Sequence, residues 1–350
     1  MFKLILKKKK IYIIFIVTSI FLIFMFIKLT PAQRDDTFLD NYFDELPDKH
    51  DLINEKSSSS NIIFIQTNSL AKNGDQNKFT ARQACAIESA ARLNNNMNIS
   101  IIILINNNIN FTQNNYVKIL NLHYRNIFFK PIIANEYFKD TPLDNWWTSG
   151  IFNNTSKYPA VQMSDIIRLI ELWKNCGSIY SDLDVVIQKS LDNMTNFVGE
   201  VKNENMVANG VIGISCGILG KKFIEACLKY LEKYFDGNSW AGNGPAVITK
   251  ILQKLCKTKK TSEMTLKKCK GFTVYPTEKF YPIHYSEDNL YFDIDDNYKI
   301  MNKIKNSSII SIWGYSKNNR TIKVGSNAPY GLVASKYCPI IYKNCENNIF

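Results

Sequence analysis

The chain has 350 residues, of which 45% are apolar and 13% aromatic, so it holds enough hydrophobic side chains for a folded core and is not a disordered protein. Its formal net charge of +12 would suit a nucleic-acid-binding protein. However, five lysines of that excess lie at the N-terminus, and the other basic residues are dispersed among acids without forming a basic helix face, which argues against nucleic acid as a partner.

The N-terminus predicts a single membrane span. A basic tail, residues 1–10, precedes an apolar run at 11–27 that contains only three polar side chains. A helix of that length covers about 26 Å, enough for a thin bilayer. Because the lysines precede the span, the positive-inside rule keeps the tail cytosolic and sends the rest of the chain into the lumen. A cleaved signal peptide is the alternative, but its apolar run is usually only ~7–15 residues, and residues 28–32 offer a poor cleavage site.

The segment after the span predicts a flexible stem, because residues 28–60 are polar and end in four serines. Sequons for N-glycosylation support a luminal location only weakly, since an Asn-rich chain generates them by chance. They occur at Asn98, Asn110, Asn153, Asn154, Asn193, Asn306 and Asn319. All eight cysteines follow the span, and an oxidising lumen would permit disulfides. Their spacing does not match a zinc site.

Two short strands and a helix are predicted after the stem. Apolar, β-branched runs at 61–67 and 99–105 are typical of buried strands. Between them, residues 80–93 carry alanines and an isoleucine near helical spacing. A strand, a helix and a strand in this order predict a βαβ unit and therefore a parallel sheet.

A second helix and strand surround a pair of carboxylates. Ser164 is predicted as the helix N-cap, with Asp165 in the first turn, where the helix dipole favours a carboxylate. Residues 175–178 end this helix, and a strand follows that is interrupted at 182–184 by Asp-Leu-Asp. Carboxylates at the end of a buried strand lie at the carboxyl edge of the sheet, where open α/β folds bind ligands.

The chemistry of Asp182 and Asp184 suits a hard divalent cation such as Mn²⁺ or Mg²⁺, which prefers oxygen ligands. Such a cation would neutralise and orient the diphosphate leaving group of a sugar nucleotide. On its own, Asp-x-Asp is a weak signal, because Asp293-Ile294-Asp295 repeats it in a polar stretch that predicts a solvated loop. The pair at 182 and 184 gains weight from its setting after a helix and a glycine-bearing turn.

At this point the sequence resembles a known family. Ser164-Asp165-x-x-Arg168, Trp173-Lys174, Gly177, Ile179-Tyr180 and Asp182-x-Asp184 resemble the DXD region of the α1,4-glycosyltransferases of glycosyltransferase family 32. Further ordered matches extend from residue 61 to 339. They are Asn61–Phe64, Glu88–Arg92, Phe138–Leu143, Asn209-Gly210, Gly244-Pro245, Phe280–Ile283 and Tyr337–Pro339.

The resemblance implies an α/β fold of the GT-A type, with a Rossmann-like nucleotide-sugar-binding domain, over residues 61–345. Residues 61–200 would form the DXD part and 201–345 the acceptor-side part. The implied ligands are Mn²⁺ (or Mg²⁺) and a UDP-sugar donor, with retention of the α-anomeric configuration. The implied catalytic and metal-binding residues are Asp182 and Asp184, and the implied donor-binding residues are Asp165, Arg168 and Tyr180. Candidates for an acceptor or C-terminal site are Asn209, Gly210, Asn243, Gly244 and Trp313.

Two of these expectations each have a simpler, structural alternative. Asp165 and Arg168 share a helix face at i and i+3 and could be only a local surface ion pair. Cys256 and Cys269 flank a Lys-rich stretch that is costly to order, and the family has cysteines at both positions, which together predict a disulfide. The alternative is two buried free thiols in separate parts of the core.

The chain departs from the family at two motifs. The family's Gly-Gly-x-Tyr has only Gly177, followed by Ser178, and its C-terminal His-x-Trp-Asn is replaced by Ser311-Ile312-Trp313-Gly314. The expected function is a Golgi, single-pass type II α1,4-glycosyltransferase that moves Gal, GalNAc or GlcNAc from a UDP-sugar to a glycosphingolipid or glycoprotein. One alternative is a catalytically impaired, sugar-nucleotide-binding relative that acts as a partner or chaperone. Another is an unrelated luminal structural domain.

Overall fold

The computed structural model describes residues 36–47, 59–70, 79–105, 111–201, 204–314 and 320–350. Its contacts divide the chain into two units, residues 1–40 and 41–350. In the first unit the described residues form one short 3₁₀ helix, η1 (Thr37–Leu39). The predicted tail and membrane span lie outside the described residues, and among the described helices none has the length and hydropathy needed to cross a bilayer.

The second unit is built on a mixed β-sheet. Seven of the described strands form it, in the order β3-β2-β1-β4-β7-β6-β8. They are β1 (Asn61–Gln66), β2 (Asn98–Leu104), β3 (Ile127–Ile132), β4 (Ser178–Ser181), β6 (Phe197–Val201), β7 (Met206–Ile214) and β8 (Thr273–Tyr275). Strands β1 to β4 run parallel, whereas β7 is antiparallel to both β4 and β6. A separate pair joins β5 (Val185–Ile187) to β9 (Ile309–Ser311).

The first βαβ unit forms as the sequence predicts. Strands β1 and β2 pair in parallel with Asn61 opposite Asn98, and both strands are buried along almost their whole length. Between them, α3 (Ala81–Leu93) begins with a capping box, in which Thr80 and Gln83 satisfy each other's backbone N–H groups. The apolar periodicity therefore predicted both the elements and their parallel pairing.

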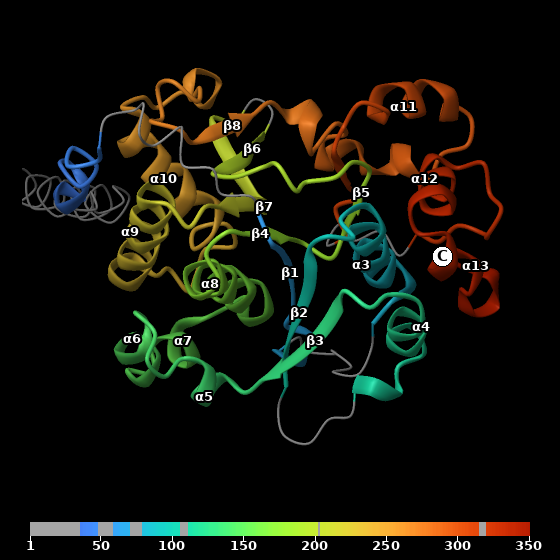
Figure 1. The fold of residues 1–350 in the computed structure, drawn as a ribbon, viewed down its shortest axis with the longest axis horizontal. Helices are drawn as coiled ribbons and strands as arrows, with labels where there is room; N and C mark the ends of the chain where they lie inside the picture. Colours follow the sequence, from blue (N-terminus) through green and yellow to red (C-terminus); the bar gives the residue numbers. More distant parts are fainter. Residues whose placement is uncertain (1–35, 48–58, 71–78, 106–110, 202–203, 315–319) are drawn as a thin grey trace, which may run out of the picture. The chain divides into compact units, whose positions relative to one another are not determined.

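Helices cover both faces of the sheet (Figure 1). Helices α3 and α4 (Asn115–His123) lie on one side of the strands, and α8 (Pro159–Lys174), α9 (Ile218–Tyr234) and α10 (Pro245–Cys256) lie on the other. The C-terminal helices α12 (Pro329–Tyr337) and α13 (Pro339–Lys343) pack against α3. The remaining α-helices of the described residues are α5 (Ala134–Tyr137), α6 (Asp144–Thr148), α7 (Ile151–Thr155) and α11 (Asn297–Ile304).

The start of α8 corrects a prediction. Ser164 is not an N-cap, because the helix begins five residues earlier, at Pro159. Proline is well suited to a first helical position, where its missing N–H costs no hydrogen bond. Asp165 therefore lies inside the helix and is buried, so neighbouring side chains rather than the helix dipole stabilise it.

The strand order creates a topological switch point between β1 and β4. The chain proceeds from β1 outward to β2 and β3, then crosses through α8 to the other side of β1 to form β4. Crossover helices on opposite faces leave a crevice at the carboxyl ends of the two strands where the direction reverses, and open α/β sheets bind ligands there. Asp182 directly follows β4, so this crevice is where its carboxylate lies.

Three disulfides cross-link the second unit. Cys256 and Cys269, the predicted pair, are bonded with their Cα atoms 4.2 Å apart. The other two bonds, Cys85–Cys338 and Cys176–Cys216, were not predicted. The first of them fastens α3 to the end of α12, 253 residues further along the chain.

Part of the expected stem packs on the folded domain. Within the second unit, the Lys270 ammonium donates a hydrogen bond to the Phe43 carbonyl oxygen over 2.7 Å. Lys257 pairs with Asp44 over 3.0 Å, and the Phe43 side chain is buried. Residues 41–47 are therefore ordered, and the expectation of a flexible segment does not hold for them.

Candidate active site

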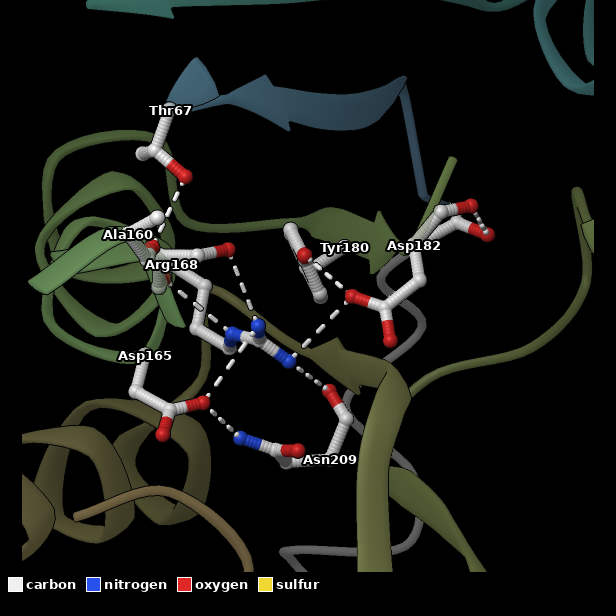
Figure 2. Close-up of polar contacts among 9 residues, drawn as sticks. Thr67, Ala160, Asp165, Arg168, Tyr180, Asp182 and Asn209 are labelled. Carbon is white, nitrogen blue, oxygen red and sulfur yellow. Dashed lines mark hydrogen bonds and ion pairs between the residues drawn. The ribbon is translucent and has the colours of Figure 1, made fainter. Parts of the chain in front are cut away.

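The site lies at the carboxyl edge of β1 and β4. Asp182 follows the last residue of β4, and its backbone N–H donates to the carbonyl oxygen of Gly210 in β7 over 2.7 Å. Thr67 follows the last residue of β1, and its hydroxyl donates to the carbonyl oxygen of Ala160 over 2.8 Å. Figure 2 shows this contact beside the polar network, so the start of α8 is fixed at the same edge of the sheet.

Arg168 is the centre of a buried polar network (Figure 2). Its guanidinium donates to the Asn209 carbonyl oxygen over 2.7 Å and to the Ser164 hydroxyl over 3.0 Å. It also pairs with Asp165 over 3.3 Å and with Asp182 over 3.4 Å. The predicted pair of Asp165 and Arg168 is thus buried and part of a network, which rules out a surface ion pair.

Asp165 is held from two sides and keeps one oxygen free. Its Oδ1 accepts from the Asn209 amide over 2.6 Å as well as facing Arg168. Its Oδ2 is buried and has no hydrogen-bond partner among the described residues. Gly244 packs directly on this pair, where a Cβ atom would collide with Asp165 and Asn209. A buried carboxylate oxygen without a partner is costly, so it marks a place where a ligand hydroxyl would be favourable.

One oxygen of the Asp182 carboxylate is bound by protein groups, and the side chain remains partly accessible to solvent. Its Oδ1 accepts from the Tyr180 hydroxyl and faces Arg168, whose guanidinium lies 4.3 Å from the centre of the Tyr180 ring. Its Oδ2 faces Gly210, where a Cβ atom would come within 2.6 Å. The side chain is 34% exposed. Glycine at 210 therefore leaves the second oxygen open to a ligand.

The C-terminal part of the chain reaches Asp184. Pairing of β9 with β5 brings Ser311 opposite Val185 and carries the chain on to Gly314. The Gly314 N–H donates to Asp184 Oδ2 over 2.8 Å, and the Ile312 N–H donates to the Asp184 carbonyl oxygen over 2.9 Å. Asp184 Oδ1 is buried without a partner among the described residues. This oxygen is the second one that a ligand could use.

Burial and crowding raise the pKa of the carboxyl groups. Burial and the nearby Asp182 carboxylate raise the pKa of Asp184 to about 7. Burial raises the pKa of Asp165 to about 6, although Arg168 and Asn209 oppose the rise, and it also raises the pKa of Asp182. Burial opposes the charge on Arg168, but Tyr180 and the carboxylates outweigh it and hold its pKa above its usual value. Two carboxylates thus pair with the Arg168 guanidinium, and Asp184 adds a third carboxylate beside Asp182, which crowds negative charge at this site.

This arrangement fits a divalent cation. Asp182 offers an open oxygen and Asp184 a buried, unpartnered one, and both are hard ligands of the kind that Mn²⁺ and Mg²⁺ prefer. A cation beside them would remove the repulsion that raises the pKa of Asp184. Among the described residues no group of three or more acidic, His or Cys side chains could hold a metal, so the remaining ligands would come from water or from a phosphate-bearing substrate.

The structure brings most of the predicted site residues together. Asp165, Arg168, Tyr180, Asp182, Asp184, Asn209, Gly210, Gly244 and Trp313 lie in or directly beside the cluster. Asn243 differs, because its amide binds both backbone polar groups of Asp236 and so holds a neighbouring loop. The second Asp-x-Asp, at Asp293 and Asp295, is exposed between two short helices, in agreement with the predicted solvated loop.

The two departures from the family have different consequences. Gly177 adopts the left-handed backbone with φ at +71°, whereas Ser178 is extended in β4, so a second glycine is not required there. At the C-terminal motif, Ser311 is buried in β9, and Gly314 offers a backbone N–H where the family has an asparagine side chain. The Trp313 indole N–H donates to the Ile283 carbonyl oxygen over 2.8 Å, which fixes the ring beside the site.

Tyr281 is a site residue that carried no predicted role. Its ring lies 5.4 Å from that of Trp313, and its buried hydroxyl has no hydrogen bond of normal geometry with the described residues. Burial and the carboxylates of Asp182 and Asp184 raise its pKa. A Cβ atom at Gly210 would lie 3.3 Å from the hydroxyl oxygen and 2.6 Å from Asp182 Oδ2, so the phenol and this carboxylate oxygen border the same glycine. The Phe-Tyr-Pro-Ile match was the only signal in the sequence, and it assigns no task to the phenol.

Two family models match consecutive parts of the chain. "Glycosyltransferase sugar-binding region containing DXD motif" matches residues 80–198, which contain Asp165, Arg168 and the carboxylate pair. "Alpha 1,4-glycosyltransferase conserved region" matches residues 218–345, which contain Tyr281 and Gly314. The resemblance noted in the sequence is therefore confirmed by both models.

Curated relatives agree with these matches. The human lactosylceramide 4-alpha-galactosyltransferase is 25% identical over 285 residues, which cover 81% of this chain and 76% of the relative. The human alpha-1,4-N-acetylglucosaminyltransferase is 25% identical over 221 residues, which cover 63% of this chain and 62% of the relative.

Solved structures are similar only at a distance. The PaToxG glycosyltransferase matches with a TM-score of 0.40 and 20% identity, over 74% of this chain and 87% of that one. The galactosyltransferase LgtC, in complex with donor and acceptor sugar analogs, matches with a TM-score of 0.40 and 14% identity, over 81% and 95% of the two chains. The functional assignment rests on the sequence matches and the site geometry instead.

Proposed function

We propose that this chain, a glycosyltransferase related to the α1,4-linking enzymes, transfers a hexose or N-acetylhexosamine from a UDP-sugar to a glycolipid or glycan acceptor at the site around Asp182. The observation that carries the proposal is the pair of available carboxylate oxygens, Asp182 Oδ2 and Asp184 Oδ1, beside a buried Arg168 network at the carboxyl edge of the sheet.

The donor sugar would lie against the Asp165 end of the network. Asp165 Oδ2 is a buried acceptor without a partner, suited to a sugar hydroxyl. Arg168 holds Asp165 and Asp182 in fixed positions, so their carboxylate oxygens are oriented before the substrate arrives. A donor sugar that lacks the hydroxyl facing Asp165 would bind much more weakly, since the carboxylate oxygen would then stay unpaired.

A divalent cation, Mn²⁺ or Mg²⁺, would be held by Asp182 and Asp184, and when bound it supplies positive charge to the diphosphate leaving group. The protein prepares for that charge in two ways. Tyr180 and Arg168 fix one oxygen of Asp182, and the Gly314 N–H fixes one oxygen of Asp184. Each carboxylate is thereby oriented by the protein through one oxygen while its other oxygen stays available.

The α1,4 linkage and the acceptor class come from the relatives. Their names describe 4-alpha-galactosyl and alpha-1,4-N-acetylglucosaminyl transfer, and one names lactosylceramide. Because UDP-hexoses are α-configured at the anomeric carbon, an α-linked product means retention. We therefore propose a retaining transfer to a 4-hydroxyl of a sugar, with a lactosylceramide-like glycolipid or a glycoprotein glycan as the acceptor.

The cellular location of the chain, in the Golgi membrane, is part of the same proposal. The basic tail and apolar run at residues 1–27 support a type II anchor in the Golgi membrane, with the glycosyltransferase domain in the lumen. The disulfides support an oxidising compartment, since such bonds are rare in the cytosol. Both features fit a glycolipid acceptor that is itself bound to the membrane.

A panel of UDP-sugars tests the proposed function. The full chain in detergent is incubated with UDP-Gal, UDP-GalNAc or UDP-GlcNAc, Mn²⁺ and either lactosylceramide or a glycoprotein acceptor, and the products are analysed by mass spectrometry. One donor should give a product that is heavier by a single sugar, with an α anomeric proton by NMR. Failure of all three donors on glycolipid and glycoprotein acceptors alike would contradict the proposal.

The structure also gives a reason to keep the impaired-relative alternative. Ser311 and Gly314 place no imidazole or amide side chain beside Asp184, so a cation there receives no help from the C-terminal motif. A protein that binds UDP with Mn²⁺ but never releases UDP from a UDP-sugar would be such a partner or chaperone. Measuring UDP release and UDP affinity on the same sample separates the two functions.

A further inference from the structure

A single stripe of α8 connects the donor site to a pair of exposed aromatic rings. Tyr158, Gln162 and Asp165 are spaced at i, i+4 and i+7, so they share one helix face. Asp165 belongs to the donor site, and Gln162 is completely buried. Tyr158, at the start of the helix, is 37% exposed. It precedes Asp165 by about 10 Å along the helix axis, at a rise of about 1.5 Å per residue.

The segment 236–244 runs along this helix face and is fixed by close packing and hydrogen bonds along its length. At one end, Gly244 packs on Asp165 and Asn209. In the middle, the Gln162 amide donates to the carbonyl oxygens of three residues, with distances from 2.8 to 3.2 Å. These residues are Asp236, Gly237 and Ser239. Asn243 accepts from the Asp236 N–H over 2.8 Å and donates to its carbonyl oxygen over 2.9 Å. The loop is therefore pinned by two buried amides.

The same loop presents Trp240 against Tyr158. The two rings meet edge to face, with centroids 5.2 Å apart, and Trp240 is also 37% exposed. The Lys157 N–H donates to the Gly237 carbonyl oxygen over 2.8 Å, and Gly237 packs so closely on Thr155 that a Cβ atom would collide with it. Two solvent-exposed aromatic rings are thus fixed by a scaffold of buried hydrogen bonds, which is a preorganised surface rather than a mobile one.

We propose that Tyr158 and Trp240 form an acceptor subsite, on which a hexose ring of the acceptor glycan stacks. The inference rests on the proposed function. Neutral sugars present a C–H face that packs on the apolar faces of aromatic rings. Tyr158 lies about two helical turns ahead of Asp165, and the hydrogen bond from Thr67 to Ala160 ties this end of α8 to the carboxyl edge of β1 (Figure 2). A sugar on the platform would therefore be next to the donor sugar and not in its place.

The platform gives Asn243 and Gly244 a physical role. Asn243 supports the loop that carries Trp240, and Gly244 permits the loop to approach Asp165. The acceptor subsite and the donor site then share one rigid element, α8, so the distance between the two sugars is set by the helix.

The test uses the full chain in detergent, with Trp240→Ala and Tyr158→Ala as variants and lactose as the acceptor probe. The KM for lactose should rise at least about fivefold in either variant, or about 1 kcal/mol, while the KM for the UDP-sugar changes by less than about twofold. Trp240→Phe and Tyr158→Phe keep an aromatic ring and should retain most of the affinity. Tyr298→Ala removes a ring that is 83% exposed elsewhere, in α11, and is the matched control.

Two results would overturn the platform while leaving the proposed function intact. One is an unchanged KM for lactose in Trp240→Ala. The other is an equal loss of donor and acceptor affinity, which would mean that the loop only supports the donor site. Saturation-transfer NMR of lactose with UDP and Mn²⁺ decides the question without turnover. Wild-type binding that Trp240→Ala loses supports the platform even if transfer fails, whereas equal signals, or none from the wild type, overturn it.

Discussion

Arg168 shows at the scale of a residue why the donor site needs a guanidinium. Its planar group contacts Asn209, Ser164, Asp165 and Asp182 at the same time. A lysine has a single nitrogen and cannot reproduce this fork of donors. Burial leaves little water to replace the lost bonds, so their removal is expensive.

We therefore predict that Arg168→Lys lowers kcat/KM for the UDP-sugar at least about 30-fold, because the loss of buried hydrogen bonds to charged groups costs about 2 kcal/mol. Steady-state kinetics with a single donor measures the change, and circular dichroism checks that the variant is folded. A lysine variant within about threefold of the wild type would mean that the charge alone is sufficient.

Tyr281 gives the second prediction at this scale. A buried hydroxyl that makes no hydrogen bond of normal geometry with the described residues contributes little to stability, and phenylalanine would fill the same space beside Trp313. Tyr281→Phe should therefore leave the melting temperature unchanged or raise it, yet reduce donor turnover several-fold if the hydroxyl, which borders Asp182, binds the donor. Thermal unfolding and UDP release are measured on the same preparation. Unchanged turnover would show that the phenol has no role in the reaction.

At the scale of elements, local patterns predicted some features and missed others for identifiable reasons. The apolar runs of β1 and β2 and the helical spacing of α3 are local signals, so both the elements and the parallel pairing could be predicted. The start of α8 was placed too late because Ser164-Asp165 imitates a cap, although Pro159 is the true beginning. The carboxylate pair was correctly placed at the end of a strand, since β4 is short and fully buried.

Features that depend on distant parts of the chain could not be predicted. Ser311 and Val185 are paired only because β9 returns to β5, and this return places the Gly314 N–H on Asp184. Nothing in the local sequence around either strand records the partnership. The Cys85–Cys338 bond is likewise invisible from spacing, since eight cysteines permit many connectivities.

The disulfide between Cys256 and Cys269 gives the prediction at this scale. It closes a short, Lys-rich loop after α10, with a sequence separation of 13. The Cys256→Ala, Cys269→Ala double variant should lose about 3 kcal/mol of unfolding free energy on the loop-closure model. Urea unfolding measures the loss, and the wild type treated with reductant should move in the same direction. Equal midpoints for the oxidised wild type and the double variant would contradict a stabilising role.

At the scale of the whole molecule, the site is assembled from both halves of the chain. Residues 80–198 contribute Asp165, Arg168 and the carboxylate pair, whereas residues 218–345 contribute Gly314 and Tyr281. The Cys85–Cys338 bond and the buried Glu88, which accepts from the Ile340 and Ile341 N–H groups, hold the halves together. The two halves are therefore expected to unfold together.

The N-terminal segment gives a prediction for the complete chain. The lysines before the apolar run should keep the N-terminus cytosolic, so a tag at the C-terminus should be protected from protease in sealed microsomes. Carbonate should not extract the protein, because a membrane span is held by its hydrophobic length. Secretion of a fragment that begins near Gln33 would show instead that the run is a cleaved signal peptide.

The central claim is that Asp182 and Asp184 bind a divalent cation together with a nucleotide diphosphate. Calorimetric titration of UDP into the full chain, with and without Mn²⁺, tests it most directly. The wild type should bind UDP at least about tenfold more tightly with Mn²⁺, a gain of about 1.4 kcal/mol, and Asp184→Asn should lose this gain. Asp293→Asn, in the exposed copy of the motif, should keep it. Equal UDP affinity with and without Mn²⁺ in the wild type, or an undiminished Mn²⁺ effect in Asp184→Asn, would contradict the claim.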